Sequence, residues 1–560
     1  MAVRDRRLPA LAVCVALALV HTWPLVTAPG TLSRTDNADT MLNQWILAWV
    51  AHALATSPLD LFHANIFYPE PRTLAFSEHL FVPSLFGAPL FWLGGSPVLV
   101  YNVVLWCGLA LTAFTTMLVV HRWTDDWWAA LTAGSLAAFN TETLTRMGHI
   151  QAMHVEFLPL ALLALDDVLR DGRWRDGIRL GVYAAAQMLC SGYLLVMTAI
   201  GLAVGTLAQP ARWLGARARQ VLPALLTGIA VMGALTAPFL YQYYRVQHDQ
   251  GLTRDFDEIG MYSAAWANYL ATGGRFHFEW WSSQYYAQAN STAFPGVLPL
   301  LLALVAVLSG VALRDGRARM WLAIGMAGMA LSFGPRLPGY ELLYYGFPLL
   351  QGIRAVARFG FLWLFAIAIL TGFGLAWLRA RLVQRTSSGR VLATALGVAC
   401  FVIVNLENTR VPMGFVEAAE IPAIYRTLAG EKDAIVAELP FPEPRRVANN
   451  GQFVWASTQH WKPLLNGYSG FLPMSYGRHW EAFHAFPDPS VIDALRDAGV
   501  THIVVHMAHV PDAAAALRTV PGVTLFAESD RIRIYRIADR GSRIADRGSG
   551  IADRGSGTED

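Results

Sequence analysis

Long apolar runs dominate the first 406 residues of the chain. A helix needs about 20 apolar residues to cross a hydrocarbon layer of about 30 Å. The clear candidates are 8–27, 97–120, 220–240, 297–314, 358–379 and 390–406, and shorter or more polar ones are 127–140, 152–169 and 318–334. The pattern predicts an α-helical polytopic membrane protein.

The run 177–208 is too long for one crossing and rather short for two. A turn at Ser191-Gly192-Tyr193 would divide it into a hairpin of two short helices. Arginine-rich short connections mark the cytoplasmic side. In this chain every arginine-rich connection can lie on the cytoplasmic side only under two conditions. The run 177–208 must cross twice, and Leu80–Trp92 must be a re-entrant or interfacial helix that does not cross. This arrangement predicts about eleven spans, a cytoplasmic N-terminus and an extracytoplasmic C-terminal domain.

Composition supports the same class of protein. Hydrophobic residues make up 54% of the 560 residues and charged residues only 15%, whereas soluble domains carry about 25% charged residues. The net charge of +3 gives no reason to expect a nucleic-acid partner. The first apolar run could instead be a cleaved signal peptide, but its length favours a retained anchor.

The pattern changes after residue 406. Segments 434–439, 501–505 and 531–535 alternate as strands do, and 421–428 and 490–498 have helical spacing. We therefore expect a membrane domain over 1–406 with a long first outer loop, 28–96, and a small extracytoplasmic α/β domain over 407–536. The tail, 537–560, repeats Ile-Ala-Asp-Arg-Gly-Ser from Ile537, Ile544 and Ile551, which predicts disorder.

The first outer loop begins with two acids, Asp36 and Asp39. Carboxylates at a membrane face are costly unless a function or partner holds them there. Apolar residues recur at helical spacing from Thr40 to Ala55, which predicts a helix on the outer surface with Trp45 and Trp49 facing the headgroups. Asp39 is placed to cap a helix that starts at Thr40. That role leaves Asp36 as the preferred candidate for a catalytic base, although Asp39 could serve both roles or bind a divalent cation.

Other polar residues lie at the predicted outer ends of spans. Glu78 and His79 could approach Asp36 as an acid partner or metal ligand, or could cap the next helix. Arg354 and Arg358 are four residues apart, and on a helix they would share a face that could grip a phosphate. The alternative for them is snorkelling toward headgroups.

A third polar cluster precedes the run 152–169. It contains His149, Gln151 and His154, with Arg146 nearby and able to join a phosphate site. These side chains could line a site for the carrier or acceptor, or could cap the helix that follows; a two-histidine metal motif is weak at this spacing. In the C-terminal domain, Asn466–Phe471 is predicted to form a rigid turn.

An acid pair directly after the first span, in a long outer loop with surface helices, resembles the GT-C superfamily of polytopic glycosyltransferases. Its members include protein O-mannosyltransferases, oligosaccharyltransferases and bacterial aminoarabinose-type transferases. The resemblance implies a lipid-phosphate-linked sugar donor and a catalytic role for an acid of the first outer loop. The chain is also similar to a group of bacterial multi-span proteins with an outer C-terminal domain, through Asn43–His52, Asn65–Pro69, Ser77–Leu80, His149–Pro159, Arg354–Phe359 and Leu465–Phe471.

Together these features predict a hexosyl- or pentosyltransferase of the bacterial inner membrane. It would transfer a sugar from a polyprenyl-phosphate donor to an extracytoplasmic glycan, lipid or protein, with Asp36 or Asp39 as the base. Mg²⁺ or Mn²⁺ is a possible cofactor under this hypothesis. The alternatives are a non-enzymatic transporter or flippase of lipid-linked saccharides, and a membrane scaffold. A transporter places ionisable residues at mid-span, where this chain has almost none.

Overall fold

A computed structural model describes residues 7–34, 36–251, 256–385 and 387–538. The chain forms two compact units. The first, called the helical unit, comprises Met1–Arg34 and Glu78–Ala418, and the second, called the α/β unit, comprises Thr35–Ser77 and Ala419–Asp560. The predicted repeat tail lies outside the described residues beyond Ala538.

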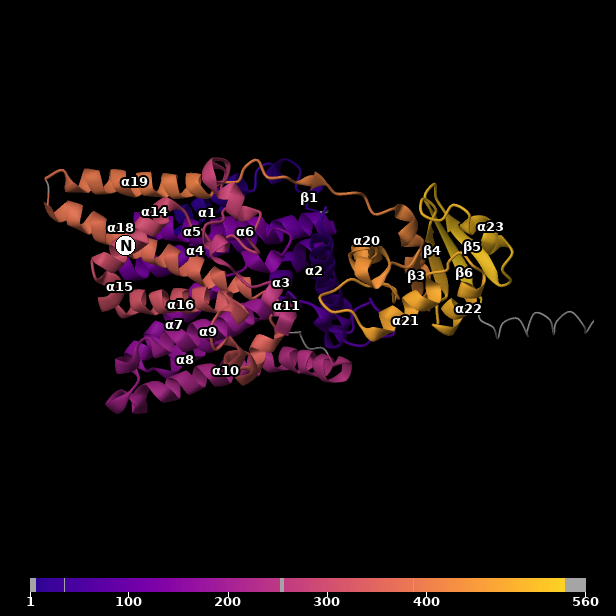
Figure 1. Cartoon of the computed structure of the whole chain (residues 1–560), viewed down its shortest axis with the longest axis horizontal. Coiled ribbons are helices and arrows are strands. Elements are labelled where there is room, and N and C mark those ends of the chain that lie inside the picture. The colour runs from indigo at the N-terminus through magenta and orange to yellow at the C-terminus, as the bar shows by residue number, and fades with distance from the viewer. Residues whose placement is uncertain (1–6, 35, 252–255, 386, 539–560) are drawn as a thin grey trace, which may run out of the picture. The chain divides into compact units, whose positions relative to one another are not determined.

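Long helices build the helical unit, and in Figure 1 they run roughly alongside one another. Each apolar run expected to cross a membrane forms a helix. These helices are α1 (Arg7–His21), α4 (Pro97–Thr124), α5 (Trp127–Phe139), α7 (Phe157–Asp171), α10 (Ala218–Gln250), α14 (Val297–Leu308), α16 (Gly316–Ser332), α18 (Gly360–Arg385) and α19 (Gly389–Asn408). Four helical stretches are long and apolar enough to cross a membrane by themselves: Pro97–Thr124, Gly215–Gln250, Val356–Arg385 and Gly389–Asn408. The protein is therefore a polytopic membrane protein, and the count of about eleven spans stays a prediction.

The run 177–208 forms the predicted hairpin, since α8 (Trp174–Met188) and α9 (Gly192–Leu207) are separated by a short turn. Ser191 caps α9, and its hydroxyl accepts hydrogen bonds from the N–H groups of Tyr193 at 3.1 Å and Leu194 at 3.4 Å. Leu80–Trp92 is helical as α3 (Phe81–Trp92), whose 12 residues are too few to cross a bilayer.

Glycines allow the closest helix contacts, as is usual where helices pack in a membrane. In α8, a Cβ added to Gly181 would lie 2.6 Å from the carbonyl oxygen of Gly228 in α10. The remaining helices of this unit are α6 (Thr141–Thr145), α11 (Phe256–Met261), α12 (Arg275–His277), α13 (Ser283–Tyr286), α15 (Val311–Arg314) and α17 (Tyr340–Gly346). A short antiparallel pair, β1 (Leu32–Ser33) and β2 (Val416–Glu417), joins the first loop to the end of the last long helix.

The α/β unit contains a four-stranded sheet in the order β3-β4-β6-β5. β3 (Val436–Leu439) and β4 (His502–His506) are parallel, and β6 (Ile532–Ile537) and β5 (Val523–Glu528) are antiparallel to their neighbours. The three predicted strands are confirmed, and β5 was not predicted because most of its side chains are partly or fully exposed. The helices are α2 (Ala38–Thr56), α20 (Gly451–Ala456), α21 (Met474–Phe483), α22 (Ser490–Asp497) and α23 (Ala513–Arg518). The segment 421–428, predicted to be helical, forms a 3₁₀ helix at Ala423–Gly430.

Residues 36–77 of the first outer loop fold as part of the α/β unit, an association that no local pattern in the sequence indicates. The N–H of Tyr68 donates to the carbonyl of Leu464 at 2.9 Å, and the N–H of Leu464 donates to Asn65 at 2.9 Å. The prediction that Trp45 and Trp49 face headgroups is wrong. Trp45 is 1% exposed and Trp49 is 7% exposed, and both indole N–H groups donate within the unit, to Asn65 at 3.2 Å and Leu61 at 2.9 Å.

Candidate active site

The two acids of the first outer loop have different surroundings. Helix α2 begins at Ala38, and the side chain of Asn37 caps it by accepting a hydrogen bond from the N–H of Asp39 at 2.8 Å. The prediction that Asp39 caps a helix starting at Thr40 is therefore wrong. Its carboxylate lies in the first turn of α2, where the helix dipole favours negative charge. The hydroxyl of Tyr468 donates to Asp39 Oδ1 at 2.6 Å, whereas Asp36 precedes the helix and is exposed.

Glu78 belongs to the helical unit and lies at the N-terminus of α9. The N–H of Gly192 donates to Glu78 Oε2 at 2.5 Å. Burial raises the pKa of Glu78, while hydrogen bonds from Gly192 and Ser191 and the charge of Arg358 oppose that shift. The alternative that Glu78 caps the helix directly after it, α3, is therefore wrong for this residue, because its carboxylate lies at the N-terminus of α9.

His79 points into a buried aromatic environment. Its Nδ1 accepts a hydrogen bond from the N–H of Phe81 at 3.0 Å, which places it at the start of α3. The ring lies 5.0 Å from Phe239 and 5.9 Å from Tyr243, and the side chain is buried. Burial lowers the pKa of His79 to about 3, so its imidazole is neutral near pH 7 and cannot offer a positive charge to a phosphate.

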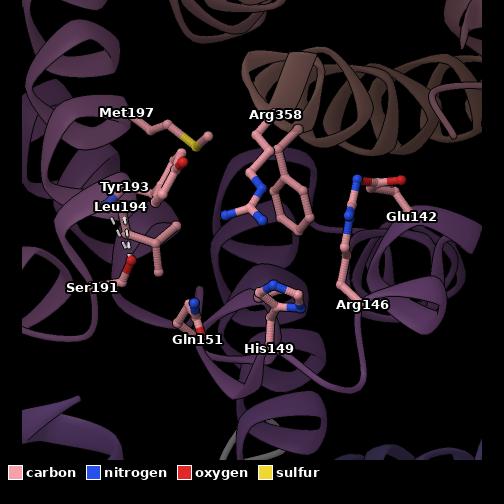
Figure 2. Close-up of a pocket in the computed structure, with 11 residues that line it drawn as sticks. Glu142, Arg146, His149, Gln151, Ser191, Tyr193, Leu194, Met197 and Arg358 are labelled. Atoms are coloured by element: carbon pink, nitrogen blue, oxygen red, sulfur yellow. Dashed lines mark hydrogen bonds and ion pairs between the residues drawn. The ribbon is translucent and has the colours of Figure 1, made fainter. Parts of the chain in front are cut away.

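A small hollow lies within the helical unit, where the start of α9, the segment 149–152, α6 and the start of α18 meet. Figure 2 shows Arg358 and His149 reaching toward one another across it, with Ser191 and Tyr193 on one side and Arg146 with Glu142 on the other. The lining is Glu142, Arg146, His149, Gln151, Ala152, Ser191, Tyr193, Leu194, Met197, Arg358 and Phe361. The hollow is thus lined by cationic, polar and apolar side chains together.

Arg358 is a second cation that lines this hollow. Within the part of the chain that the structure describes, no oxygen accepts a hydrogen bond from its guanidinium and no carboxylate forms an ion pair with it. Its Cζ lies 4.5 Å from the centre of the Tyr193 ring, which holds the guanidinium by a cation–π contact. A guanidinium carries five N–H donors, so this arrangement is suited to binding an oxyanion.

Arg146 is held at the opposite wall. Its Nε donates to Glu142 Oε1 at 2.8 Å and its Nη2 donates to the carbonyl of Asn290 at 2.7 Å. The Glu142 carboxylate raises the pKa of Arg146. Burial acts to raise the pKa of Glu142, but the charge of Arg146 and hydrogen bonds from Thr292 hold it below its ordinary value. Arg146 lies in this lining, and its expected place in a phosphate site stays a prediction.

The polar residues of segment 149–154 have two different positions, beside the hollow or inside the packed helices. His149 and Gln151 line the hollow, and Gln151 Oε1 is buried with no hydrogen-bond partner among the described residues. His154 does not line it; it is fully buried, with Nδ1 3.0 Å from Glu156 and Nε2 3.1 Å from the carbonyl of Val104. His154 therefore supports the fold, and Gln151 offers an acceptor to a ligand.

The pairing expected of Arg354 with Arg358 is wrong, because the segment between them is not α-helical. A 3₁₀ helix spans Val356–Phe359, and α18 begins only at Gly360. Arg354 lies 3.7 Å from Glu258 and its Cζ lies 5.0 Å from the Tyr262 ring, and it does not line the hollow. The arginine that lines the hollow together with Arg358 is Arg146.

Two lining residues were not expected to belong to a site. Glu142 stands four residues before Arg146 on α6, and that spacing is the one local signal that could have indicated the ion pair. Tyr193 was expected only as part of a turn, and nothing in the local sequence places Arg358 over its ring.

Glu142→Gln should lower the thermal stability of the protein by about 1–3 kcal/mol near pH 7, because Arg146 and Thr292 lose a charged partner. Since the folded pKa of Glu142 lies below its ordinary value of 4.5, this stabilisation is present above that value and is lost as the pH falls through the lowered one. Thermal unfolding in detergent at pH values above and below 4.5 measures this effect. The difference in melting temperature between wild type and variant should become smaller as the pH falls. Glu341→Gln, at an exposed position of the same unit, should leave the curve unchanged, and a pH-independent gap would contradict the assignment.

No group of three or more His, Cys, Asp or Glu side chains that could hold a metal ion is present among the described residues. The divalent cation named as a possible cofactor therefore has no such ligand set there, and it stays an expectation from the sequence.

The chain, which contains a polytopic helical unit and a small α/β unit, is similar in fold to two solved glycosyltransferases. The arabinofuranosyltransferase AftD from Mycobacteria is similar in structure, with a TM-score of 0.59 and 15% identity over 96% of this chain and 40% of AftD. The oligosaccharyltransferase AglB from Archaeoglobus fulgidus, in complex with an inhibitory peptide and a dolichol-phosphate, gives a TM-score of 0.53 and 10% identity over 92% of this chain and 71% of AglB. The chain thus spans about two fifths of the length of AftD. No protein-family model and no curated protein sequence matches it.

Proposed function

We propose that this protein is a membrane glycosyltransferase that transfers a sugar from a polyprenyl-phosphate donor to an extracytoplasmic acceptor. The observation that carries the proposal is Arg358, a guanidinium that has no acceptor among the described residues and lines a hollow with Arg146. Two arginines beside one hollow suit a phosphate, since guanidinium groups bind phosphate oxygens bidentately. Leu194, Met197 and Phe361 provide apolar lining suited to the first part of a prenyl chain.

The sugar end of the donor would meet the polar lining. Gln151 Oε1 is a buried acceptor without a partner among the described residues, and a sugar hydroxyl is a donor of suitable size. Ser191 and His149 line the same hollow. This assignment explains why a buried amide oxygen is left unsatisfied by the protein, which would otherwise only destabilise the fold.

The reaction needs one base and one stabiliser of the leaving group. The acceptor hydroxyl attacks the anomeric carbon and its proton passes to a carboxylate, for which we assign Asp39 in place of Asp36. The bond between the anomeric carbon and the phosphate oxygen breaks, and the polyprenyl phosphate leaves with its electron pair. Arg358 and Arg146 would stabilise the charge that develops on that phosphate.

The structural neighbours support a lipid-linked donor without defining the sugar. AglB is described with a dolichol-phosphate, which is a lipid phosphate, and AftD is described as an arabinofuranosyltransferase, which transfers a pentose. By analogy, hexoses and pentoses are both reasonable candidates for this chain. The arginine pattern supports an extracytoplasmic position for this chemistry, at the bacterial inner membrane.

The purified full-length protein in nanodiscs should be incubated with polyprenyl-phosphate hexoses and pentoses and with membrane extracts as a source of acceptors. We expect sugar transfer from at least one donor, together with release of polyprenyl phosphate. A folded protein that transfers nothing from any donor would contradict the proposal. Movement of intact lipid-linked sugar across proteoliposomes without transfer would indicate the transporter alternative instead.

A further inference from the structure

We propose that Tyr468 is a positioning residue for Asp39, and that the turn Asn466–Phe471 exists to present it. The inference rests on the proposed function and concerns only the α/β unit. The hydroxyl of Tyr468 donates to Asp39 Oδ1 at 2.6 Å, across 429 residues of sequence. This length is typical of a hydrogen bond between a hydroxyl and a charged carboxylate, which is stronger than a bond between neutral groups.

The turn that carries Tyr468 is fixed by the side chain of Asn466, which is fully buried. Its Nδ2 donates to the carbonyl of Glu438 at 3.2 Å and to Asn450 Oδ1 at 3.0 Å, and its Oδ1 accepts from the N–H of Glu438 at 2.8 Å. The carbonyl of Asn466 also accepts from the N–H of Phe67 at 3.1 Å. The turn is therefore tied both to strand β3 and to the first outer loop.

Two glycines allow the turn to lie directly against that loop. A Cβ on Gly467 would lie 2.5 Å from the ring of Phe67, and a Cβ on Gly470 would lie 3.0 Å from the carbonyl oxygen of Phe76. Larger residues at either position would push the turn away and carry Tyr468 with it. The glycines flanking this tyrosine are thus explained by the close approach that its contact requires.

The other partner of the contact is fixed as well. The cap at Asn37 sets where α2 begins, and Trp45 anchors the same helix through its hydrogen bond to Asn65. Ala38 lies against Gly451, where an added Cβ would be 3.2 Å from the Ala38 Cβ. Because both the helix and the turn are anchored within one unit, the Tyr468 hydroxyl defines the orientation of the Asp39 carboxylate. A base must be held in this way, since a displacement of about 1 Å can cost about 100-fold in rate.

Tyr468→Phe removes the hydroxyl and keeps the ring. We expect kcat for sugar transfer to fall by about 10–100-fold while KM for donor and acceptor changes less than about twofold. Tyr425→Phe is the matched control, because Tyr425 is another tyrosine of this unit whose hydroxyl donates to a carboxylate, Glu438, at 3.2 Å. That control should keep the wild-type kcat. In an Asp39→Asn background, Tyr468→Phe should cause no further loss.

Each outcome decides between the hypotheses. An active wild type with an unaffected Tyr468→Phe overturns the role of Tyr468 and leaves the proposed function standing. Equal losses in Tyr468→Phe and Tyr425→Phe, or a loss that adds to that of Asp39→Asn, also overturn it, because a general effect on the unit would explain them. A folded wild type without transferase activity overturns both. If Tyr468→Phe does not fold, fluorotyrosine at position 468 changes only the strength of the donor, and an unchanged kcat would then count against the role.

Discussion

Arg358→Gln should abolish productive binding of the donor, raising its KM by about 100-fold or more and lowering kcat/KM by about 100- to 1000-fold. The guanidinium has no acceptor among the described residues, so its hydrogen bonds are available to the phosphate of the donor. Two charge-assisted bonds of about 1.5–3 kcal/mol each account for a loss of this size. Arg358→Lys keeps the charge but loses the fork of donors, so it should recover only part of the affinity. Initial rates against donor concentration measure both constants.

Arg354→Gln is the matched control for this prediction. It removes a guanidinium four residues away that is engaged with Glu258 and Tyr262 and does not line the hollow. Donor KM in this variant should stay within about threefold of wild type, the range expected for an exposed ion pair. Binding of polyprenyl phosphate by itself, followed as thermal stabilisation, should be lost in Arg358→Gln and retained in Arg354→Gln. Equal affinities in the two variants would show that the hollow is not the phosphate site.

Asp39→Asn should lower kcat by about 100- to 10,000-fold and leave donor KM nearly unchanged, as expected when a general base is removed. The substitution has almost no steric effect, and the amide oxygen can still accept the hydrogen bond from Tyr468. Single-turnover assays at saturating donor separate this loss of chemistry from any loss of binding. A melting temperature close to that of the wild type would show that the fold is intact.

Asp36→Asn provides the comparison that decides between the two acids. Asp36 is exposed and precedes α2, whereas Asp39 lies in the first turn and is held by a tyrosine. We therefore expect Asp36→Asn to keep activity within about threefold of wild type, as is usual for a surface substitution. The reverse result, with the large loss in Asp36→Asn, would make Asp36 the base and would remove the reason for the contact with Tyr468.

The choice between Asp36 and Asp39 as the base depends on where helix α2 begins, which the local sequence pattern does not define to the residue. The sequence alone favours Asp36, because Asp39 stands directly before a helical pattern that begins at Thr40. The helix starts two residues earlier, at Ala38, and Asn37 takes the capping role. A helix end is defined by one or two backbone conformations, so a shift of this size changes which side chain is a cap and which can take part in chemistry.

The positions of the arginines also could not be derived from local spacing. Spacing could place Arg354 and Arg358 on one face only if the segment were α-helical, and a 3₁₀ helix there separates them. The residue that shares the hollow with Arg358 is Arg146, far away in sequence, although it was noted as a possible member of a phosphate site. His79 has the residue type of a ligand, but burial keeps it neutral near pH 7.

The sequence by itself determined the membrane-protein class, the positions of the long helices, the hairpin at Ser191 and three of the four strands of the sheet. Each of these follows from hydrophobic length or periodicity over neighbouring residues, which the chain carries locally. Only the tertiary structure decided that the first outer loop folds with the C-terminal strands, that Tyr468 donates to Asp39, and that Arg358 lines a hollow with Arg146. These contacts join segments hundreds of residues apart, and packing and hydrogen-bond satisfaction of the whole chain select them, so no local pattern could contain them.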